Sequence, residues 1–285
     1  MTSLKYKSII PKFHVKGPNL VKTVYYDGLR VLGKPEEYAE LYYDDGCDEI
    51  IVHDVVAHLL EKTINLETIK SISEKVFVPI TAGGGIKSIK DIEKILESGA
   101  SKVSLNTYAL ENPDFISKAA NTFGSSTISV SIDSGKIDNE YFAFGLNGRS
   151  PTSKKVLSWA KEAEEKGAGE IILSSIDKDG TGEGYDIDLL NNVKKNCSVR
   201  IVGNSGAGSY EDIIDLLKET ELEAISLSSL LHYTYLKKVK KISKYKEEGN
   251  SAFLDNEFKN FKNFDNFYIP DLKKKLISKN LSIRI

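Results

Sequence analysis

One stretch decides the fold: Val78-Pro79-Ile80-Thr81-Ala82-Gly83-Gly84-Gly85-Ile86. It is an apolar run of the length of a buried strand, and it ends in three glycines. About 121 residues later the pattern returns as Val199-Arg200-Ile201-Val202-Gly203-Asn204-Ser205-Gly206-Ala207. The two stretches indicate that one structural unit occurs twice in the chain.

The segments on either side repeat at nearly the same offset. Upstream, Gly46–Ile51 corresponds to Gly167–Ile172, and downstream Val103–Thr107 corresponds to Ile225–Ser229. Solenoid repeats have periods of roughly 20–50 residues, so a period this long excludes them. The pattern indicates two copies of a half-domain that each contain several strand–helix units.

Short apolar runs predict eight strands, and the amphipathic segments between most of them predict helices. Alternating strands and helices imply a parallel sheet, and the half-repeat favours closure into a barrel. A (β/α)8 barrel needs about 250 residues, which fits a chain of 285. We therefore expect an α/β fold, a TIM barrel built from two homologous half-barrels, as one domain over residues 1–285. The predicted strands are Ser8–Ile10, Glu49–His53, Val78–Ala82, Lys102–Leu105, Ser126–Ile132, Glu170–Ser174, Arg200–Val202 and Glu223–Leu227.

Two segments do not fit the strand–helix pattern. Ile137–Thr152 follows the fifth predicted strand and is expected to form a small hairpin. Residues 244–268 contain five phenylalanines among polar residues, and we interpret them as an insertion before a C-terminal helix over Asp271–Lys279. The insertion is predicted either to pack on the barrel as a helix or to dock loosely.

The composition excludes several classes of protein. A formal net charge of −2 gives no broad positive field for nucleic acid. Cys47 and Cys197, the only cysteines, suggest a reducing compartment rather than a disulfide framework. Four scattered histidines show no metal-ligand spacing, and nothing in the sequence indicates a cofactor. Residues 1–12 contain no signal-peptide apolar run, and no stretch could span a membrane, so we expect a cytoplasmic protein.

The glycine turns predict two phosphate-binding sites. In a parallel barrel the functional site lies where the strands end, and glycine lets the backbone approach phosphate oxygens closely. Each glycine turn is followed, one strand later, by polar residues that can donate hydrogen bonds. A single such turn could be purely structural, but two related turns with matching donors favour binding. The first site comprises Gly84, Gly85, Asn106 and Thr107, and the second comprises Ser205, Gly206, Ser228 and Ser229.

Carboxylates at the strand ends are the candidate acid–base groups. Asp133 ends the apolar strand five and should point into the mouth of the barrel, where a carboxylate can transfer protons. A helix cap or a loop contact is the structural alternative for Asp133. For Asp54 and Asp177 loop ordering is equally compatible with the sequence.

The chain resembles a known family, the cyclase subunit of imidazole glycerol phosphate synthase from histidine biosynthesis. The resemblance covers about residues 7–236 and the last dozen residues. The motifs that carry it are Ile80–Ile86, Lys102–Thr107, Ser131–Asp133 and the long Gly167–Thr181 run. The sister isomerase of the same pathway shares the half-repeat but matches Gly167–Thr181 less well.

The resemblance implies a substrate with a phosphate at each end, in which an aminoimidazole carboxamide ribotide is joined to phosphoribulose by a formimino group. It also implies a glutamine amidotransferase partner subunit in a heterodimer, whose ammonia passes through the barrel and closes an imidazole ring. Asp133 matches one of the two catalytic aspartates, whereas His14 occupies the strand-one position of the other. Histidine can also move protons near neutral pH. Further substrate-binding residues implied by the resemblance are Lys22, Asp54, Ser174, Asp179, Gly180 and Thr181.

The resemblance also implies a ring of charged residues that gates ammonia at the barrel floor. Glu49, Lys102 and Glu170 match this gate, while Ser8 occupies the arginine position and Lys7 is a candidate substitute. These departures leave an alternative open. The chain could be a paralogue without the strand-one aspartate that conducts ammonia for amidino-sugar formation in surface-glycan biosynthesis.

Overall fold

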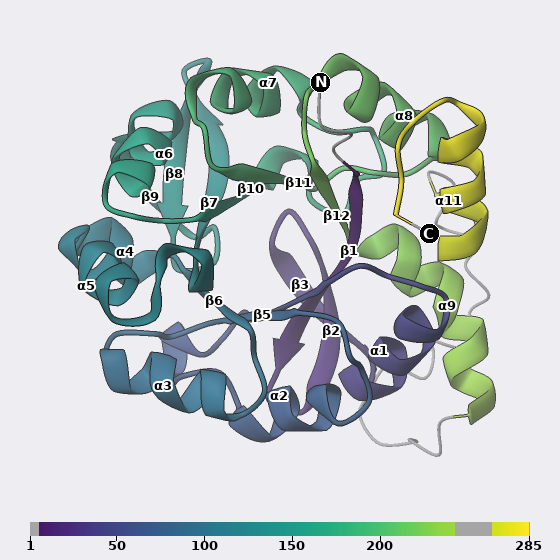
Figure 1. Ribbon diagram of the computed structural model, residues 1–285, viewed down its shortest axis with the longest axis horizontal. Helices are drawn as coiled ribbons and strands as arrows, with labels where there is room; N and C mark the ends of the chain where they lie inside the picture. The colour runs from purple at the N-terminus through teal and green to yellow at the C-terminus, as the bar shows by residue number, and fades with distance from the viewer. Residues whose placement is uncertain (1–5, 243–263, 285) are drawn as a thin grey trace.

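The protein is a closed barrel of parallel strands. The computed structural model describes residues 6–242 and 264–284. Each barrel strand pairs with two neighbours, and the pairing of β7 with β10 leaves no free edge in the ring. Figure 1 looks along the barrel, with the helices outside the strands. The barrel strands are β1 (Ser8–Lys16), β4 (Ile50–Asp54), β5 (Ile80–Gly83), β6 (Lys102–Leu105), β7 (Ile128–Ile137), β10 (Glu170–Ser175), β11 (Arg200–Asn204) and β12 (Ala224–Leu227).

Each helix has one apolar face that packs on the strands. In α3 the apolar face holds Ile92 and Ile95, both fully buried, and Ser88 caps the first turn by accepting a hydrogen bond from the Asp91 N–H. The described helices are α1 (Pro35–Asp44), α2 (Leu66–Ser73), α3 (Ile89–Glu97), α4 (Thr107–Glu111), α5 (Asp114–Phe123), α6 (Val156–Glu165), α7 (Ile187–Asn196), α8 (Tyr210–Glu219), α9 (Ser229–Ile242) and α11 (Ile269–Ser278). Three short 3-10 helices are η1 (His58–Leu60), η2 (Ser125–Thr127) and η3 (Ile176–Lys178).

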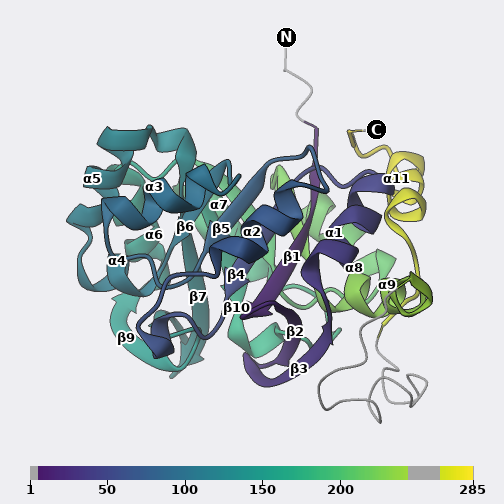
Figure 2. The ribbon, with the colours of Figure 1, turned by 90° about the horizontal axis from the view of Figure 1, so that it is seen from below.

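Two hairpins extend the barrel at the end where the strands finish. The hairpin after β7, made with β8 (Glu140–Gly145) and β9 (Ser150–Lys155), confirms the one predicted after strand five. The other hairpin, β2 (Asn19–Val24) and β3 (Asp27–Gly33), was not expected. In Figure 2 the β2–β3 hairpin lies at the opposite end of the molecule from the two chain termini.

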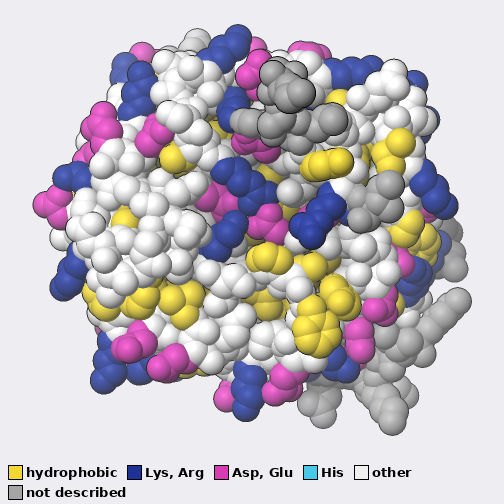
Figure 3. All heavy atoms as spheres, viewed as in Figure 1, with side chains coloured by type: hydrophobic (Ala, Val, Ile, Leu, Met, Phe, Trp, Pro, Cys, Tyr) yellow, Lys and Arg dark blue, Asp and Glu magenta, His cyan; other side chains and the backbone are white. Residues whose placement is uncertain are grey.

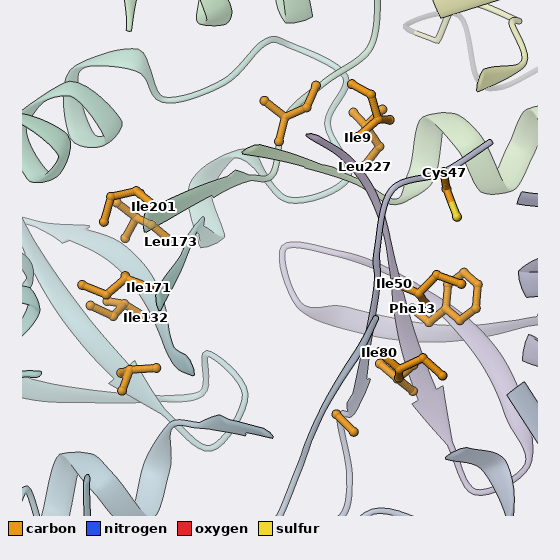
Figure 4. Packing of buried hydrophobic residues seen from close by; sticks show 14 of the residues in the cluster. Ile9, Phe13, Cys47, Ile50, Ile80, Ile132, Ile171, Leu173, Ile201 and Leu227 are labelled. Carbon is orange, nitrogen blue, oxygen red and sulfur yellow. The ribbon is translucent and has the colours of Figure 1, made fainter. Parts of the chain in front are cut away.

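Most of the core lies between the strands and the helices. Figure 4 shows part of it, with Phe13 packed beside Ile50 and Leu173 beside Ile201. The alternate residues of the strands face the barrel lumen, because successive side chains of a strand point to opposite faces. A second, separate apolar cluster consists of Ile10, Ile51, Ile172, Val202 and Ala224.

Several sequence-based boundaries differ from the structure. The predicted first strand ends at Ile10, whereas β1 continues to Lys16. Polar residues interrupt the apolar run after Ile10, but they face the lumen and the strand continues into the β2–β3 hairpin. The predicted C-terminal helix is confirmed as α11. Most of the predicted insertion, residues 244–268, lies outside the described residues.

No described helix is both long and apolar enough to traverse a bilayer. Within residues 6–242 and 264–284, no group of three or more His, Cys, Asp or Glu side chains is arranged to hold a metal ion.

Candidate functional site

Asp133 lies at the mouth of the barrel and is almost completely buried. The Tyr26 hydroxyl donates to its Oδ1 at 2.9 Å, and the Asn106 amide Nδ2 donates to its Oδ2 at 2.8 Å. Burial raises the pKa of Asp133 above the usual carboxyl value, although the positive charge of Lys12 opposes this. A carboxyl group with a raised pKa can hold a proton and release it, as an acid–base group must.

A first cavity of about 70 Å³ lies beside Asp133. It brings together six of the predicted residues, which come from β4, β5, β6, β7 and the loops after them. A Cβ atom at Gly85 would lie 1.8 Å from the Lys62 carbonyl oxygen, and Gly85 has φ +67, so only glycine fits there. The predicted residues that line this cavity are Asp54, Gly84, Gly85, Asn106, Thr107 and Asp133.

Three of these residues also have structural partners. The Asp54 carboxylate accepts hydrogen bonds from the N–H groups of Val56 and Ala57, which is the loop-ordering role considered from the sequence. Thr107 Oγ1 accepts from the Leu146 N–H at 2.9 Å. Asn106 was expected to donate to phosphate, but its amide donates to Asp133. Its Oδ1 is buried and has no hydrogen-bond partner among the described residues.

A second cavity, smaller at about 20 Å³, is lined by the other glycine turn. A Cβ atom at Gly206 would lie 2.1 Å from the Gly184 carbonyl oxygen, and Gly206 has φ +105, so only glycine fits there. Ser205 has φ +80, a conformation that non-glycine residues rarely adopt. Helix α9 begins at Ser229 and adds free N–H groups at the cavity. The predicted residues that line it are Asp179, Gly180, Ser205, Gly206, Ser228 and Ser229.

Three predicted residues lie next to the second cavity but do not line it. The Lys22 side chain is buried, with its Nζ 3.9 Å from Asp179 Oδ2 and adjacent to Gly180. Ser174 is fully buried on β10, and its Oγ accepts a hydrogen bond from Asn204 Nδ2 at 2.9 Å. The Thr181 hydroxyl donates to the Lys178 carbonyl oxygen.

The β2–β3 hairpin lies at the mouth and contacts residues of both cavities. Asp179 Oδ2, at the second cavity, accepts hydrogen bonds from the Thr23 hydroxyl and from the Tyr26 N–H. The Tyr26 side chain then reaches Asp133 at the first cavity. The two cavities share no lining residue. The hairpin is therefore the element that connects the two cavities.

Four charged residues form a ring where the strands begin. Lys102 Nζ lies 3.0 Å from Glu49 Oε2 and 3.0 Å from Glu170 Oε2. Arg200 donates to the same two carboxylates, at 2.7 Å to Glu170. Acidic and basic side chains gather at the centre of this face in Figure 3.

The ring completes the predicted gate with a residue that the sequence analysis did not assign. Arg200 starts β11 and supplies the arginine that is missing at Ser8. Lys7, the suggested substitute, donates to the carbonyl oxygen of Leu222. The sequence contained one signal for Arg200 as a member of the ring. Arg200 is the first residue of a strand, as are Lys102 and Glu170.

Comparison with known proteins identifies the family of the chain. The family described as "Histidine biosynthesis protein" matches residues 8–237, which is most of the chain. The chain belongs to this family.

Curated members of the histidine-biosynthesis family align over most of their own length. The chain is 41% identical over 229 residues to "Imidazole glycerol phosphate synthase subunit HisF" of Lactococcus lactis subsp. cremoris (strain MG1363), covering 80% of this chain and 88% of that protein. It is 42% identical over 205 residues to the subunit of the same name from Legionella pneumophila, covering 72% and 97%. The Methanopyrus kandleri subunit is 39% identical, covering 80% and 90%.

His14, which stands where the resemblance implies a second catalytic aspartate, is buried and uncharged. Burial and the positive charges of Lys12 and Lys22 hold the pKa of His14 well below 6.5. Its Nδ1 lies 3.3 Å from Thr23 Oγ1. Because the Thr23 hydroxyl donates to Asp179, Nδ1–H must donate to Thr23, which leaves the lone pair on Nε2. His14 can therefore accept a hydrogen bond at Nε2 at neutral pH, but the neutral ring lacks the second ring proton that an imidazolium acid would donate.

Two site residues were missed from the sequence. Lys12 faces the lumen between Ile10 and His14 on β1, and alternation along the full strand would have placed it there. Tyr26 comes from the unexpected hairpin, and the sequence offered no signal for its contact with Asp133.

Proposed function

We propose that this chain is an ammonia-using cyclase subunit of imidazole glycerol phosphate synthase. Its substrate is then the bis-phosphorylated formimino aminoimidazole carboxamide ribotide, and its products are imidazole glycerol phosphate and the aminoimidazole ribotide. The observation that carries the proposal is a buried carboxyl group, Asp133, beside one of two glycine-lined cavities at the same mouth. That arrangement suits a molecule with two anionic ends and reactive bonds in its middle.

Each cavity would hold one phosphate. Gly84, Gly85 and Gly206 line the cavities, and their backbone N–H groups would bind the phosphate oxygens. The hydroxyls of Thr107, Ser228 and Ser229 add donors at the cavity walls. Asp133 would then transfer protons as the ring closes and as the ribotide leaves, because its raised pKa keeps both protonation states accessible.

Ammonia would enter through the charged ring and follow the polar side of the lumen. Strands β1, β4 and β10–β12 contribute the apolar cluster around Ile10 and Ile172. Strands β5–β7 instead place small hydroxyl side chains in the lumen, including Ser104 and Ser131, whose oxygens have no partner among the described residues. A small neutral molecule can exchange hydrogen bonds with such groups, and this column leads from Lys102 to Asp133.

The source of ammonia would be a glutamine amidotransferase subunit that docks over the ring. The word "subunit" in the names of the relatives indicates a multi-subunit assembly. Phe77, in the loop between α2 and β5 at this end of the barrel, is 87% exposed and packs edge-on against Tyr43. An exposed aromatic residue at the same end of the barrel as the charged ring is a suitable anchor for a partner. The two free cysteines favour a cytoplasmic location for this chain and its partner subunit.

Ring closure with ammonium salt, without the partner, tests the enzyme directly. The purified chain should convert the precursor into both products, and Asp133→Asn should lower kcat by about 10²-fold or more. The relatives named above are synthase subunits, which favours this enzyme over the ammonia-conducting paralogue. Absence of both turnover and precursor binding in the wild-type chain would refute the proposal.

A further inference from the structure

We propose that Lys12, Ser174 and Tyr26 form a proton relay to Asp133, and that Lys12 thereby supplies the second acid–base group of the site. The proposal rests on the proposed function, because it concerns the same ring-closing reaction. The second proton carrier is then on β1, two residues before His14, and its side chain faces the same lumen as His14.

Lys12 is a buried amine that crosses the barrel. Its side chain is 1% exposed, and its Nζ donates to Ser174 Oγ on β10 at 3.2 Å. A buried lysine is uncommon in proteins unless it is paired or functional. The charged groups that shift its pKa are Asp133 on β7, Asp179 after η3 and Lys22 on β2. Two histidines are also coupled to Lys12, which lowers the pKa of His14 on β1 and of His53 on β4.

The hydrogen bonds from Lys12 to Asp133 share one direction. Ser174 Oγ accepts from Lys12 Nζ and from Asn204 Nδ2, so its own proton is available to donate. The Ser174 side chain lies close to the Tyr26 hydroxyl and opposes the rise in the pKa of Tyr26, as a donor to that oxygen does. Tyr26 in turn donates to Asp133 Oδ1 at 2.9 Å. Lys12 thus donates to Ser174 at one end, and Tyr26 donates to Asp133 at the other. The relay we propose has Ser174 donate to Tyr26 between them.

The proton transfer balances without any added group. Lys12 gives one proton to Ser174, Ser174 gives its proton to Tyr26, and Tyr26 gives its proton to Asp133. The ammonium becomes an amine and the carboxylate becomes a carboxylic acid, while both hydroxyls are restored. Burial lowers the pKa of Lys12 and raises the pKa of Asp133, so the ion pair and the neutral pair are brought closer in free energy.

The backbone at Tyr26 indicates that its position is imposed. Tyr25 and Tyr26 form the two-residue turn of the β2–β3 hairpin with φ +52 and +61. Asparagine and glycine usually occupy such turns, and two tyrosines are strained there. The Tyr26 ring packs against Gly148, where a Cβ atom would lie 3.1 Å from it. The hairpin in this position brings Tyr26, which is 2% exposed, against Asp133.

His14 is not part of this chain of hydrogen bonds. Its Nδ1 contacts Thr23, which donates to Asp179 rather than to Asp133. The hydrogen bonds given above connect His14 to the second cavity only.

The test measures kcat for ammonia-dependent ring closure of the bis-phosphorylated precursor against pH, with free ammonia held constant. Lys12→Met and Tyr26→Phe should each lower kcat by about 10²-fold and remove one limb of the pH profile. Lys12→Arg should be as impaired as Lys12→Met, because arginine keeps the charge but cannot release its proton. The matched controls, Lys16→Met on the same strand and Tyr25→Phe in the same turn, should stay within about twofold of wild type. Thermal unfolding of each variant checks that it is folded.

A wild-type pH profile in Lys12→Met, or full activity in Lys12→Arg, overturns the relay. If the wild-type chain itself does not turn over the precursor, the proposed function fails and the relay is judged by NMR. The Asp133 carboxyl carbon and the Lys12 Nζ should then titrate in the same two steps, as coupled groups do. Independent titration of the two nuclei overturns the relay in that case.

Discussion

Replacing Arg200 should destabilise the protein in a way that depends on pH. Arg200 donates to Glu49 and to Glu170, and its side chain is 25% exposed. In Arg200→Met the two carboxylates keep only Lys102 as a basic partner in the ring. The variant leaves the alkyl part of the side chain nearly unchanged, so the charge is the main difference.

The expected loss follows from two charge-assisted hydrogen bonds. Each such bond contributes about 1.5–3 kcal/mol when it is buried. Partial exposure and the ordering of a long side chain reduce this, so we expect a total loss of about 2 kcal/mol in the free energy of unfolding. For a chain of this size that corresponds to a Tm about 4 °C lower.

The loss should shrink in acid. Burial pushes the pKa of Glu49 up, but the hydrogen bond and charge of Arg200, with the charge of Lys102, outweigh burial and leave the pKa below 4.5. The contribution of Glu49 to stability is therefore present above pH 4.5 and is lost as the pH falls through the lower pKa of the folded state. The difference between wild type and Arg200→Met should be full at pH 7 and should decrease below pH 4.5.

Thermal and urea unfolding at pH 7 and at pH 4 measure this difference. Arg149→Met, at an exposed position of the hairpin after β7, is the matched control and should have no effect at either pH. An Arg200→Met variant as stable as Arg149→Met, or equally destabilised at both pH values, would refute the view that the ring is held by ion pairs.

Three further predictions concern the cavities and the docking face. Gly85→Ala should lower Tm far more than Gly28→Ala, because both glycines have positive φ but only the Gly85 Cβ would collide with a carbonyl oxygen; unfolding curves of the two variants measure this. His14→Asp should raise ammonia-dependent kcat, since a carboxylate there would lie among lysines, whereas His14→Asn should not. Phe77→Ser should weaken binding of the amidotransferase subunit by about tenfold in calorimetry, and Leu60→Ser, exposed at the opposite end of the barrel, should leave it unchanged.

The barrel itself was predictable because its signals are local. Buried parallel strands appear as short apolar runs, and the helices between them show a periodic apolar stripe. The glycine turns were predictable for the same reason: a position such as Gly85, where even a methyl group collides with a neighbouring carbonyl, leaves a visible mark in the sequence.

The β2–β3 hairpin was not predictable because its turn contradicts the local rules. Its two turn residues, Tyr25 and Tyr26, are tyrosines in a conformation that favours asparagine and glycine. Contacts with Asp179 and Asp133 hold the turn in place, and those partners lie more than a hundred residues away in sequence. Only the assembled mouth of the barrel brings them together.

The resemblance implies charged residues at two positions of strand one that are Ser8 and His14 here, and in both cases a charged side chain from another position lies in the lumen. The ring has Ser8 where the resemblance implies an arginine, and Arg200 at the start of β11 donates to Glu49 and Glu170 instead. The relay proposed above has the same form: His14 carries no charge, while Lys12, on the same inward face of β1, brings a cation to the group that includes Asp133. A closed barrel permits such exchanges, because side chains from all of its strands meet in one lumen. The electrostatic character of the lumen therefore depends on which charges meet there and not on which strand provides them.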